Sequence, residues 1–325
     1  MLLLVFRKEI KKKIFDSIGQ VNKVNQINGY LLEAKSVFIE NRSTPIENVC
    51  EIGIGNKPID GGYHLFDEDE MQKFVGIESC SKKYFRRWYG AQEFINQTKR
   101  FCLWLGDASP SELRRMPHVL KRIDAVKNYR LSSPSEGTRK IVEKPTRFHV
   151  ENMTDGNYLL IPSTSSENRR YIPIGFLSEN DLSSNANLIV RGAGLYDFGI
   201  LTSNIHMAWM RTVAGRLEMR YRYSAKIVYN NFPWPTVTEE QKQFIASTVQ
   251  GILDARALYP DCSLADLYDE LTMPVELRKA HQENDIAVMK AYGMIKKVDG
   301  KDTFLTESET VARLFEMYQE LTEKK

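Results

Sequence analysis

The chain has 325 residues, 42% of them hydrophobic and 27% charged, which is the composition of an ordinary globular protein. It contains no run of about 18 apolar residues, so the sequence predicts no transmembrane helix, and its length favours two domains. The cysteines and histidines are dispersed without metal-ligand spacing, which predicts free thiols, no metal site and a cytoplasmic protein.

The formal net charge of +3 conceals an uneven distribution along the chain. Residues 82–147 contain sixteen Lys and Arg against six Asp and Glu, whereas residues 237–325 contain eleven against seventeen. A basic body beside an acidic C-terminal part favours a polyanionic partner, such as nucleic acid, for the body. The alternative is an ordinary charged surface.

The apolar run LLLVF near the start is interpreted as a buried strand. It is not typical of a signal peptide, because the basic residues follow the apolar run and no small-residue cleavage site comes after them. A strand in this place suggests that residues 1–25 are the end of a larger upstream part.

The next feature, EIGIGN (residues 51–56), is similar to the glycine turn that binds S-adenosylmethionine. Pro58 follows it and prevents a helix from starting, which favours a plain turn-rich loop over a cofactor site.

Two helices are predicted in the first half of the chain. The first covers DEDEMQKFV, with Asp67 as its N-cap, and a buried strand over RFCLWLGD follows it. The second begins at Ser109, where Glu112 completes a capping box, and Pro117 should bend or split it. Its exposed face would carry several cations, namely Arg114, Arg115, Lys121, Arg122 and Lys127.

The stretch KKYFRRWYGAQEF (Lys82–Phe94) interleaves four cations with aromatic residues. Contacts to phosphates combined with base stacking would use this pattern. A partly buried segment with snorkelling arginines would have the same pattern, so both interpretations stay open.

Short strands are predicted over RFHVENM, NYLLIPSTSS, RRYIPIGFL and NLIVRG, followed by a helix over about residues 203–213. The polar loop STSSENRR (residues 163–170) lies between two of these strands and is either a recognition loop or a plain hairpin loop.

Residues 217–224 alternate with period two, which predicts a half-buried strand. Leu217, Met219, Tyr221 and Tyr223 would face the core, whereas Glu218, Arg220, Arg222 and Ser224 would face outward. The outward face either reads a partner that needs both a cation and an acceptor, or is solvated, with Glu218 paired to a neighbouring arginine. The FPWP sequence that follows (residues 232–235) is interpreted as a rigid linker in which Trp234 is packed.

After residue 237 the sequence predicts a small acidic helical domain, opened by a capping box of Thr238 and Gln241. We find no nuclease motif, no P-loop and no nucleophile elbow, so no catalytic residue is assigned.

Several stretches taken together resemble the C-terminal half of the MmeI-type DNA methyltransferases, which are large single-chain Type IIL restriction–modification proteins. The resemblance runs from about residue 25 to the end. It is carried by IGNKPIDGG, CLWLGD, RFHVENM, YIPIGFL, FGILTSNIHMAWMR, RYRYSAKIVYNNFPWP and LADLYDELTMPVELRKAHQENDIAVM.

This resemblance implies an α/β (α+β) target recognition domain over residues 26–236 and a small all-α domain over residues 237–325. Residues 1–25 would then be the remnant of the last methyltransferase strand and its connector. It also implies double-stranded DNA as the partner, a methyltransferase domain normally in the same chain, and no membrane association. The family's S-adenosylmethionine and N-P-P-Y/F motifs do not occur here. We therefore expect no cofactor in this chain, although the full-length adenine-N6 methyltransferase would use S-adenosylmethionine.

The resemblance also implies the residues that read DNA. The base-reading pair is Glu218 and Arg220, and further base-reading positions are Ser163, Ser165, Asn185 and Asn187. The basic charge of the chain, and not the resemblance, gives the expected phosphate contacts, from Lys82, Lys83, Arg86, Arg87, Arg114, Arg115 and Arg222. Two alternatives remain, a stand-alone DNA-binding specificity protein without a catalytic half and a small enzyme with an unrecognised site.

Overall fold

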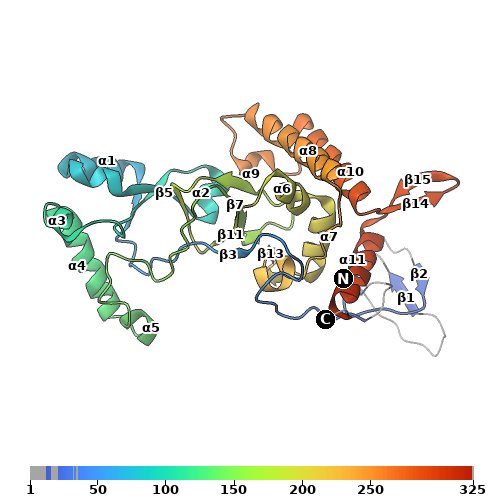
Figure 1. The fold of residues 1–325 in the computed structure, drawn as a ribbon, viewed down its shortest axis with the longest axis horizontal. Helices are drawn as coiled ribbons and strands as arrows, with labels where there is room; N and C mark the ends of the chain where they lie inside the picture. Colours follow the sequence, from blue (N-terminus) through green and yellow to red (C-terminus); the bar gives the residue numbers. More distant parts are fainter. Residues whose placement is uncertain (1–11, 16–20, 32, 34–35, 324–325) are drawn as a thin grey trace. The chain divides into compact units, whose positions relative to one another are not determined.

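The computed structural model describes residues 12–15, 21–31, 33 and 36–323 (Figure 1). The strand expected at LLLVF lies outside these residues. The chain forms two compact units, each built from separate stretches of sequence. The helical unit comprises Met1–Val49, Leu195–Ala255 and Val275–Lys325, and the sheet unit comprises Cys50–Gly194 and Arg256–Pro274. In the described part of the chain, no helix is both long and apolar enough to cross a membrane.

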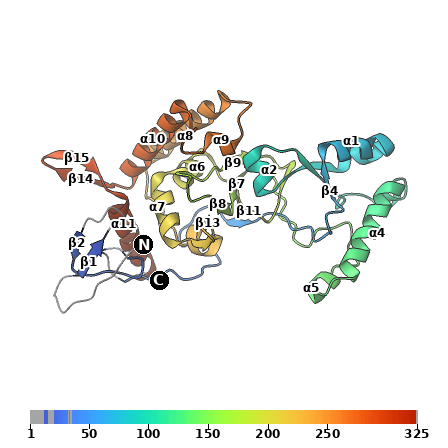
Figure 2. The ribbon, with the colours of Figure 1, turned by 180° about the vertical axis from the view of Figure 1, so that it is seen from behind.

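The sheet unit contains two four-stranded sheets, with strand orders β10-β5-β6-β4 and β3-β11-β7-β9. The pair of β10 and β5 is parallel and the other pairs are antiparallel. In Figure 2, α2 lies beside the second sheet, and Phe94 and Ile95 of this helix pack on Leu160 and Ile189 of that sheet. The strands are β3 (Ile52–Ile54), β4 (Leu65–Asp67), β5 (Phe85–Tyr89), β6 (Arg100–Leu103), β7 (Tyr158–Pro162), β8 (Thr164–Ser165), β9 (Gly175–Leu177), β10 (Asp181–Ser183) and β11 (Asn187–Arg191).

The helix starts predicted for this unit are confirmed. Asp67 caps the first helix and forms a capping box with Glu70. Ser109 and Glu112 form the second box, and Pro117 starts a new helix, because a proline fits the first helical turn but not its interior. The helices are α1 (Glu68–Ile77), η1 (Ser79–Tyr84), α2 (Ala91–Asn96), α3 (Pro110–Leu113), α4 (Pro117–Leu131), α5 (Glu136–Arg139) and α9 (Leu264–Leu267).

The strand predicted over RFHVENM is wrong, since residues 147–153 have no ladder and make a single isolated bridge at Val150. Side chains satisfy the backbone instead. Glu151 accepts from the Phe148 N–H at 3.0 Å, and Asn152 donates from its side chain to the Ile54 carbonyl at 2.7 Å. Hydrogen bonds of this kind compete with strand pairing and hold the segment as a loop.

Arg130 is completely buried in the sheet unit, although it belongs to the most polar class of residues. Its guanidinium donates to five backbone carbonyls at 2.7–3.1 Å. They come from two loops, at Pro58–Ile59 and at residues 141–147, so one side chain ties both loops to α4. The nearby His64 is also buried and contacts the Pro145 carbonyl at 3.1 Å, and burial lowers the pKa of its imidazole.

The helical unit is organised around α7, which packs against α6, α10 and α11 (Figure 1). Trp209 of α7 is fully buried, and its ring centroid lies 5.6 Å from that of Phe315. Gly199 of α6 is needed for close packing, because a Cβ there would lie 2.5 Å from Ile245 Cγ2. The helices are α6 (Leu195–Thr202), α7 (Asn204–Val213), η2 (Ala225–Tyr229), α8 (Glu239–Ala257), α10 (Val275–Ala291) and α11 (Glu307–Glu323).

Three antiparallel strand pairs, β1–β2, β12–β13 and β14–β15, complete the described part of this unit. The capping box of Thr238 and Gln241 that opens α8 is confirmed, as is the packed position of Trp234. A hairpin at residues 295–304 was not predicted, although the Asp299–Gly300 pair at its turn is a common hairpin signal. The strands are β1 (Lys12–Phe15), β2 (Val21–Val24), β12 (Gly215–Leu217), β13 (Arg220–Arg222), β14 (Ile295–Val298) and β15 (Lys301–Phe304).

We expect Arg130→Met to lower the free energy of unfolding by roughly 3–5 kcal/mol, because several buried carbonyls would lose their donor at about 1–3 kcal/mol each. Urea denaturation of the chain measures this. The matched control is Arg139→Met, since Arg139 is exposed and also donates to backbone carbonyls. A loss of similar size in both variants would show that Arg130 does not hold the loops together.

Candidate nucleic-acid interface

The segment that carries Glu218 and Arg220 is a hairpin, not the continuous strand predicted from its period-two pattern. Leu217 pairs with Arg220, so Glu218 and Met219 form a two-residue turn. Glu218 adopts φ 57°, in the left-handed region that favours glycine. Leu217 and Met219 are 45% and 69% exposed, contrary to the prediction that they face the core.

The prediction fails at the turn and holds beyond it. Tyr221 and Tyr223 are buried as expected, at 7% and 4% exposure. The pattern counts residues along one strand, whereas the turn reverses the chain after Leu217. The apolar residues before and after the turn therefore do not share a face.

Glu218 and Arg220 lie side by side at the tip of this hairpin. Arg220 Nη2 lies 2.8 Å from Glu218 Oε2, and the two side chains are 48% and 76% exposed. The carboxylate therefore pairs with Arg220 itself rather than with another arginine of the segment. Exposed pairs of this kind contribute about 0–1 kcal/mol, so both groups can exchange this contact for another partner at little cost.

The other arginines of the hairpin differ in their contacts. Arg216 lies 3.7 Å from the centroid of the Tyr221 ring and donates from Nη1 to the Met219 carbonyl at 3.1 Å. It therefore links the two strands across the tip. Arg222 is exposed on β13.

The base of the hairpin is anchored in the core of the helical unit. The Tyr223 hydroxyl lies 2.8 Å from Nε2 of His206 on α7, and both side chains are buried. The Phe232 ring stands edge-on to His206 at 4.5 Å between centroids. Burial lowers the pKa of His206 to about 3 and raises that of Tyr223 well above its usual value, so this contact joins two neutral groups. Sequence analysis missed His206, because nothing local marks it.

The other predicted base-reading residues lie in the sheet unit. Ser163 follows β7, and Asn185 lies in the turn between β10 and β11. The Ser163 N–H donates to the Ala186 carbonyl at 3.2 Å, which brings the two segments together. The Asn185 side chain is exposed and that of Ser163 is partly exposed, so both can reach a ligand.

Ser165 and Asn187 differ from these two because they are buried, with exposures of 3% and 0%. The Asn187 amide donates to the Tyr89 carbonyl at 2.8 Å and fixes β11 against the end of β5. In this arrangement neither side chain can reach a base edge, so we do not retain them as base-reading candidates.

The predicted phosphate-binding residues of the sheet unit fall into two groups. Lys82, Arg114 and Arg115 are exposed, and among the described residues none of their side chains has a partner. Lys83 is paired with Glu112, and this contact, with hydrogen bonds from Ser109, lowers the pKa of the carboxyl group to about 2.

The two remaining cations are only partly exposed. Arg86 donates to the Lys83 carbonyl at 3.1 Å, and Arg87 lies 5.2 Å from the ring centroids of Tyr89 and Phe101. Tyr84 and Trp88, which lie on either side of these two arginines in the sequence, are buried. The aromatic residues of this stretch thus belong mainly to the core, which favours the snorkelling interpretation over base stacking.

The EIGIGN turn has no room for a cofactor. A Cβ on Gly55 would lie 2.2 Å from the Ser184 carbonyl oxygen, so the turn packs directly on the backbone of residues 183–184. Gly61 and Gly62 adopt φ values of 67° and 85°, as expected for a glycine-dependent loop. The residues present therefore do not fit a bound S-adenosylmethionine. No group of three potential metal ligands occurs among the described residues.

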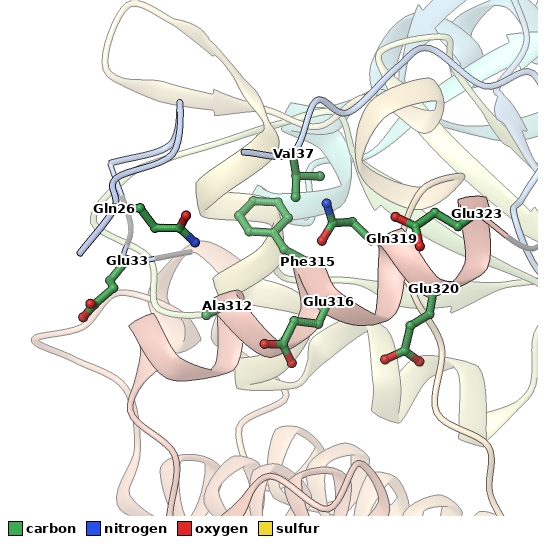
Figure 3. A pocket seen from close by; sticks show the side chains of 9 residues that line it. All are labelled: Gln26, Glu33, Val37, Ala312, Phe315, Glu316, Gln319, Glu320 and Glu323. Carbon is green, nitrogen blue, oxygen red and sulfur yellow. The ribbon is translucent and has the colours of Figure 1, made fainter. Parts of the chain in front are cut away.

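The helical unit also contains a pocket of about 440 Å³ beside α11 (Figure 3). Its walls are acidic, and Val37 and Phe315 supply its apolar surface. Carboxylates at this density repel phosphates, so the pocket is not part of a DNA surface. It is lined by Gln26, Glu33, Val37, Ala312, Phe315, Glu316, Gln319, Glu320 and Glu323.

Two family models match this chain. The MmeI target recognition domain matches residues 33–236, and the MmeI C-terminal domain matches residues 237–324. The fold is accordingly that of a mixed α/β recognition region followed by a largely helical region. The chain belongs to the MmeI family, which confirms the resemblance found in the sequence.

Two relatives show how much of such a protein is present. DNA methyltransferase A of Bacillus subtilis (strain 168) is 36% identical over 301 residues, which cover 93% of this chain and 33% of that protein. The solved structure of the Type IIL restriction-modification enzyme MmeI in complex with DNA is 45% identical, with a TM-score of 0.89. That match covers 98% of this chain and 42% of the MmeI chain. The chain thus spans less than half of either relative.

We expect His206 to make the chain sensitive to acid. Its pKa of about 3 lies below the value near 6.5 in an unfolded chain, so the unfolded state takes up a proton first. The stability contributed by neutral His206 is complete above pH 6.5 and is lost as the pH falls below it. At pH 5 the loss is about 2 kcal/mol.

The measurement is urea denaturation at about pH 7.5 and pH 5, a range that brackets the free histidine pKa. His206→Gln, which keeps a polar partner for Tyr223, should reduce the difference between the two pH values by about 2 kcal/mol. His149→Gln, at an exposed histidine, is the control and should behave as the wild type does. An unchanged difference in His206→Gln would contradict the expectation.

Proposed function

We propose that this chain is the sequence-specific, double-stranded DNA recognition module of an adenine-N6 DNA methyltransferase of the restriction–modification type. The observation that carries the proposal is the exposed Glu218–Arg220 pair at the tip of a well-anchored hairpin. Family membership and the likeness to an enzyme solved with DNA support it. In the full-length enzyme, a methyltransferase domain in the same chain would bind S-adenosylmethionine. A cytoplasmic location fits this role.

The hairpin has the dimensions and chemistry needed to read one base pair. The major groove of DNA admits a two-stranded β ribbon. There an arginine donates to O6 and N7 of guanine, and a carboxylate accepts from the N4 amino group of cytosine. Arg220 and Glu218 are already 2.8 Å apart, so they can address the two bases of one C·G pair. This role also explains a carboxylate on a surface that faces DNA.

The remaining contacts would position the chain on DNA. Lys82, Arg114, Arg115 and Arg222 are exposed and suited to phosphates, whereas Arg86 and Arg87 are largely held within the sheet unit. Ser163 and Asn185 are the further candidates for base contacts. In domain terms, we assign recognition to residues 26–236 and a supporting role to residues 237–325, with residues 1–25 forming the connection to the methyltransferase.

We expect the double exchange Glu218→Lys with Arg220→Asp to change the preferred base at one position of the recognised sequence, most simply from C to G. The expected discrimination is about 1–3 kcal/mol. Selection from a randomised duplex library, before and after the exchange, measures it. The control is the exchange of Arg313 and Glu316, an exposed ion pair of α11 with the same 2.8 Å distance. Uniform weakening on all sequences would show that the hairpin pair does not read bases.

We expect Arg114→Ala with Arg115→Ala to weaken binding equally on preferred and unrelated duplexes. Loss of two phosphate contacts should make the slope of log affinity against log salt less steep by about 1.8, at about 0.9 per contact. Fluorescence anisotropy titrations between about 50 and 200 mM salt measure the slope. Lys279→Ala with Lys290→Ala, which removes two cations of α10, is the control. A slope that does not change would place Arg114 and Arg115 away from DNA.

A further inference from the structure

The tip of the β12–β13 hairpin exposes two large apolar side chains. Met219 is 69% exposed and Leu217 is 45% exposed, and their charged neighbours in the hairpin sequence are Arg216, Glu218, Arg220 and Arg222. Neither side chain contributes to the core of the helical unit. The apolar surface of these two neighbouring side chains is therefore available for contact with a partner.

The position of Met219 is fixed by its neighbours. Glu218 adopts a left-handed φ of 57°, which a non-glycine residue takes up at some cost. Arg216 donates to the Met219 carbonyl at 3.1 Å while it stacks on the buried ring of Tyr221. The main chain of the tip is therefore clamped to the base of the hairpin, and the methionine side chain is held outward.

The charges around Met219 indicate the chemistry of the partner. Three arginines favour a polyanion over an apolar protein surface. On DNA, the base edges in the major groove are polar except for the C5-methyl group of thymine, which accepts apolar contacts. Methionine suits such a contact, because its side chain is unbranched, flexible and polarizable.

We propose that Met219 is a specificity-determining residue that contacts the C5-methyl group of a thymine next to the base pair read by Glu218 and Arg220. The inference rests on the proposed DNA-reading function of the hairpin and adds a second kind of readout to it. Met219 lies between the two polar readers in the sequence, and its exposed side chain can enter the groove that receives them. A thymine on either strand, one step from that pair, is within reach.

The experiment starts from the duplex selected by the wild-type chain from a randomised library. The Glu218→Lys, Arg220→Asp exchange locates the base pair that the hairpin reads. Each thymine of the selected duplex is then replaced in turn by deoxyuridine, which removes one methyl group and leaves the pairing unchanged. We expect wild-type affinity to fall about fourfold at one thymine adjacent to that pair, as for one buried methyl group, and to stay constant elsewhere.

The variants separate a methyl contact from a structural effect. Met219→Ala and Met219→Gln should bind the thymine and deoxyuridine duplexes equally well, while keeping the preference for the C·G pair. Met219→Gln keeps the length of the side chain and changes its polarity, so it also serves if the alanine variant does not fold. Leu271→Ala, at a leucine that is 95% exposed, is the matched control and should keep the wild-type response to deoxyuridine.

Three outcomes would overturn the proposal. The first is a wild-type chain that is insensitive to every deoxyuridine replacement, or a selected duplex without an adjacent thymine. The second is Met219→Gln with the wild-type response. The third concerns 2-aminopurine placed in the duplex next to the base pair that the hairpin reads. A rise in its fluorescence on binding would mean that the apolar tip unstacks bases as a wedge. If the wild-type chain selects no sequence at all, the proposed function fails as well, whereas selection without a methyl effect removes this inference alone.

Discussion

The hydrogen bond between His206 and Tyr223 fixes the hairpin on which the proposed function depends. A two-stranded hairpin is marginally stable on its own in water. Here its second strand is followed directly by Tyr223, whose hydroxyl lies 2.8 Å from the buried His206 of α7. That helix is in turn packed on α11 through Trp209 and Phe315. The exposed tip therefore projects from a closely packed core. Its backbone is already ordered, so the tip loses little conformational entropy when it binds a ligand.

Local chemistry made much of the fold predictable. The helix starts at Asp67, Ser109 and Thr238 follow from capping residues, and Pro117 divides its helix as the sequence indicates. The loop at residues 147–153 was not predictable in this way, because its form depends on Glu151 and Asn152 binding backbone groups. Arg130 is the extreme case. Its burial depends on backbone carbonyls from two loops that are distant in the sequence, and no local sequence pattern predicts that these loops meet.

The candidate site was predictable in part. The resemblance pointed to Glu218 and Arg220, and the structure places them in contact at an exposed tip. The alternation of the segment was misleading, because a turn can interrupt a period-two pattern without a glycine to mark it. Glu218 accepts the left-handed conformation that glycine would normally supply. Asn187 shows a different limit of sequence analysis. An asparagine in a polar stretch can donate to a backbone carbonyl, as Asn187 does to Tyr89, as readily as it can contact a base.

The contrast between Arg130 and Arg220 shows how one residue type serves two purposes. Arg130 is fully buried and each contact is a backbone carbonyl, so its removal would leave buried acceptors without donors. Arg220 is half exposed and has a single carboxylate partner that contributes little to stability. A group that reads a ligand has to leave its resting partner when the ligand arrives. Under the proposed function, the weak pair with Glu218 would keep Arg220 oriented before DNA binds and release it at small cost, which a buried pair would not allow.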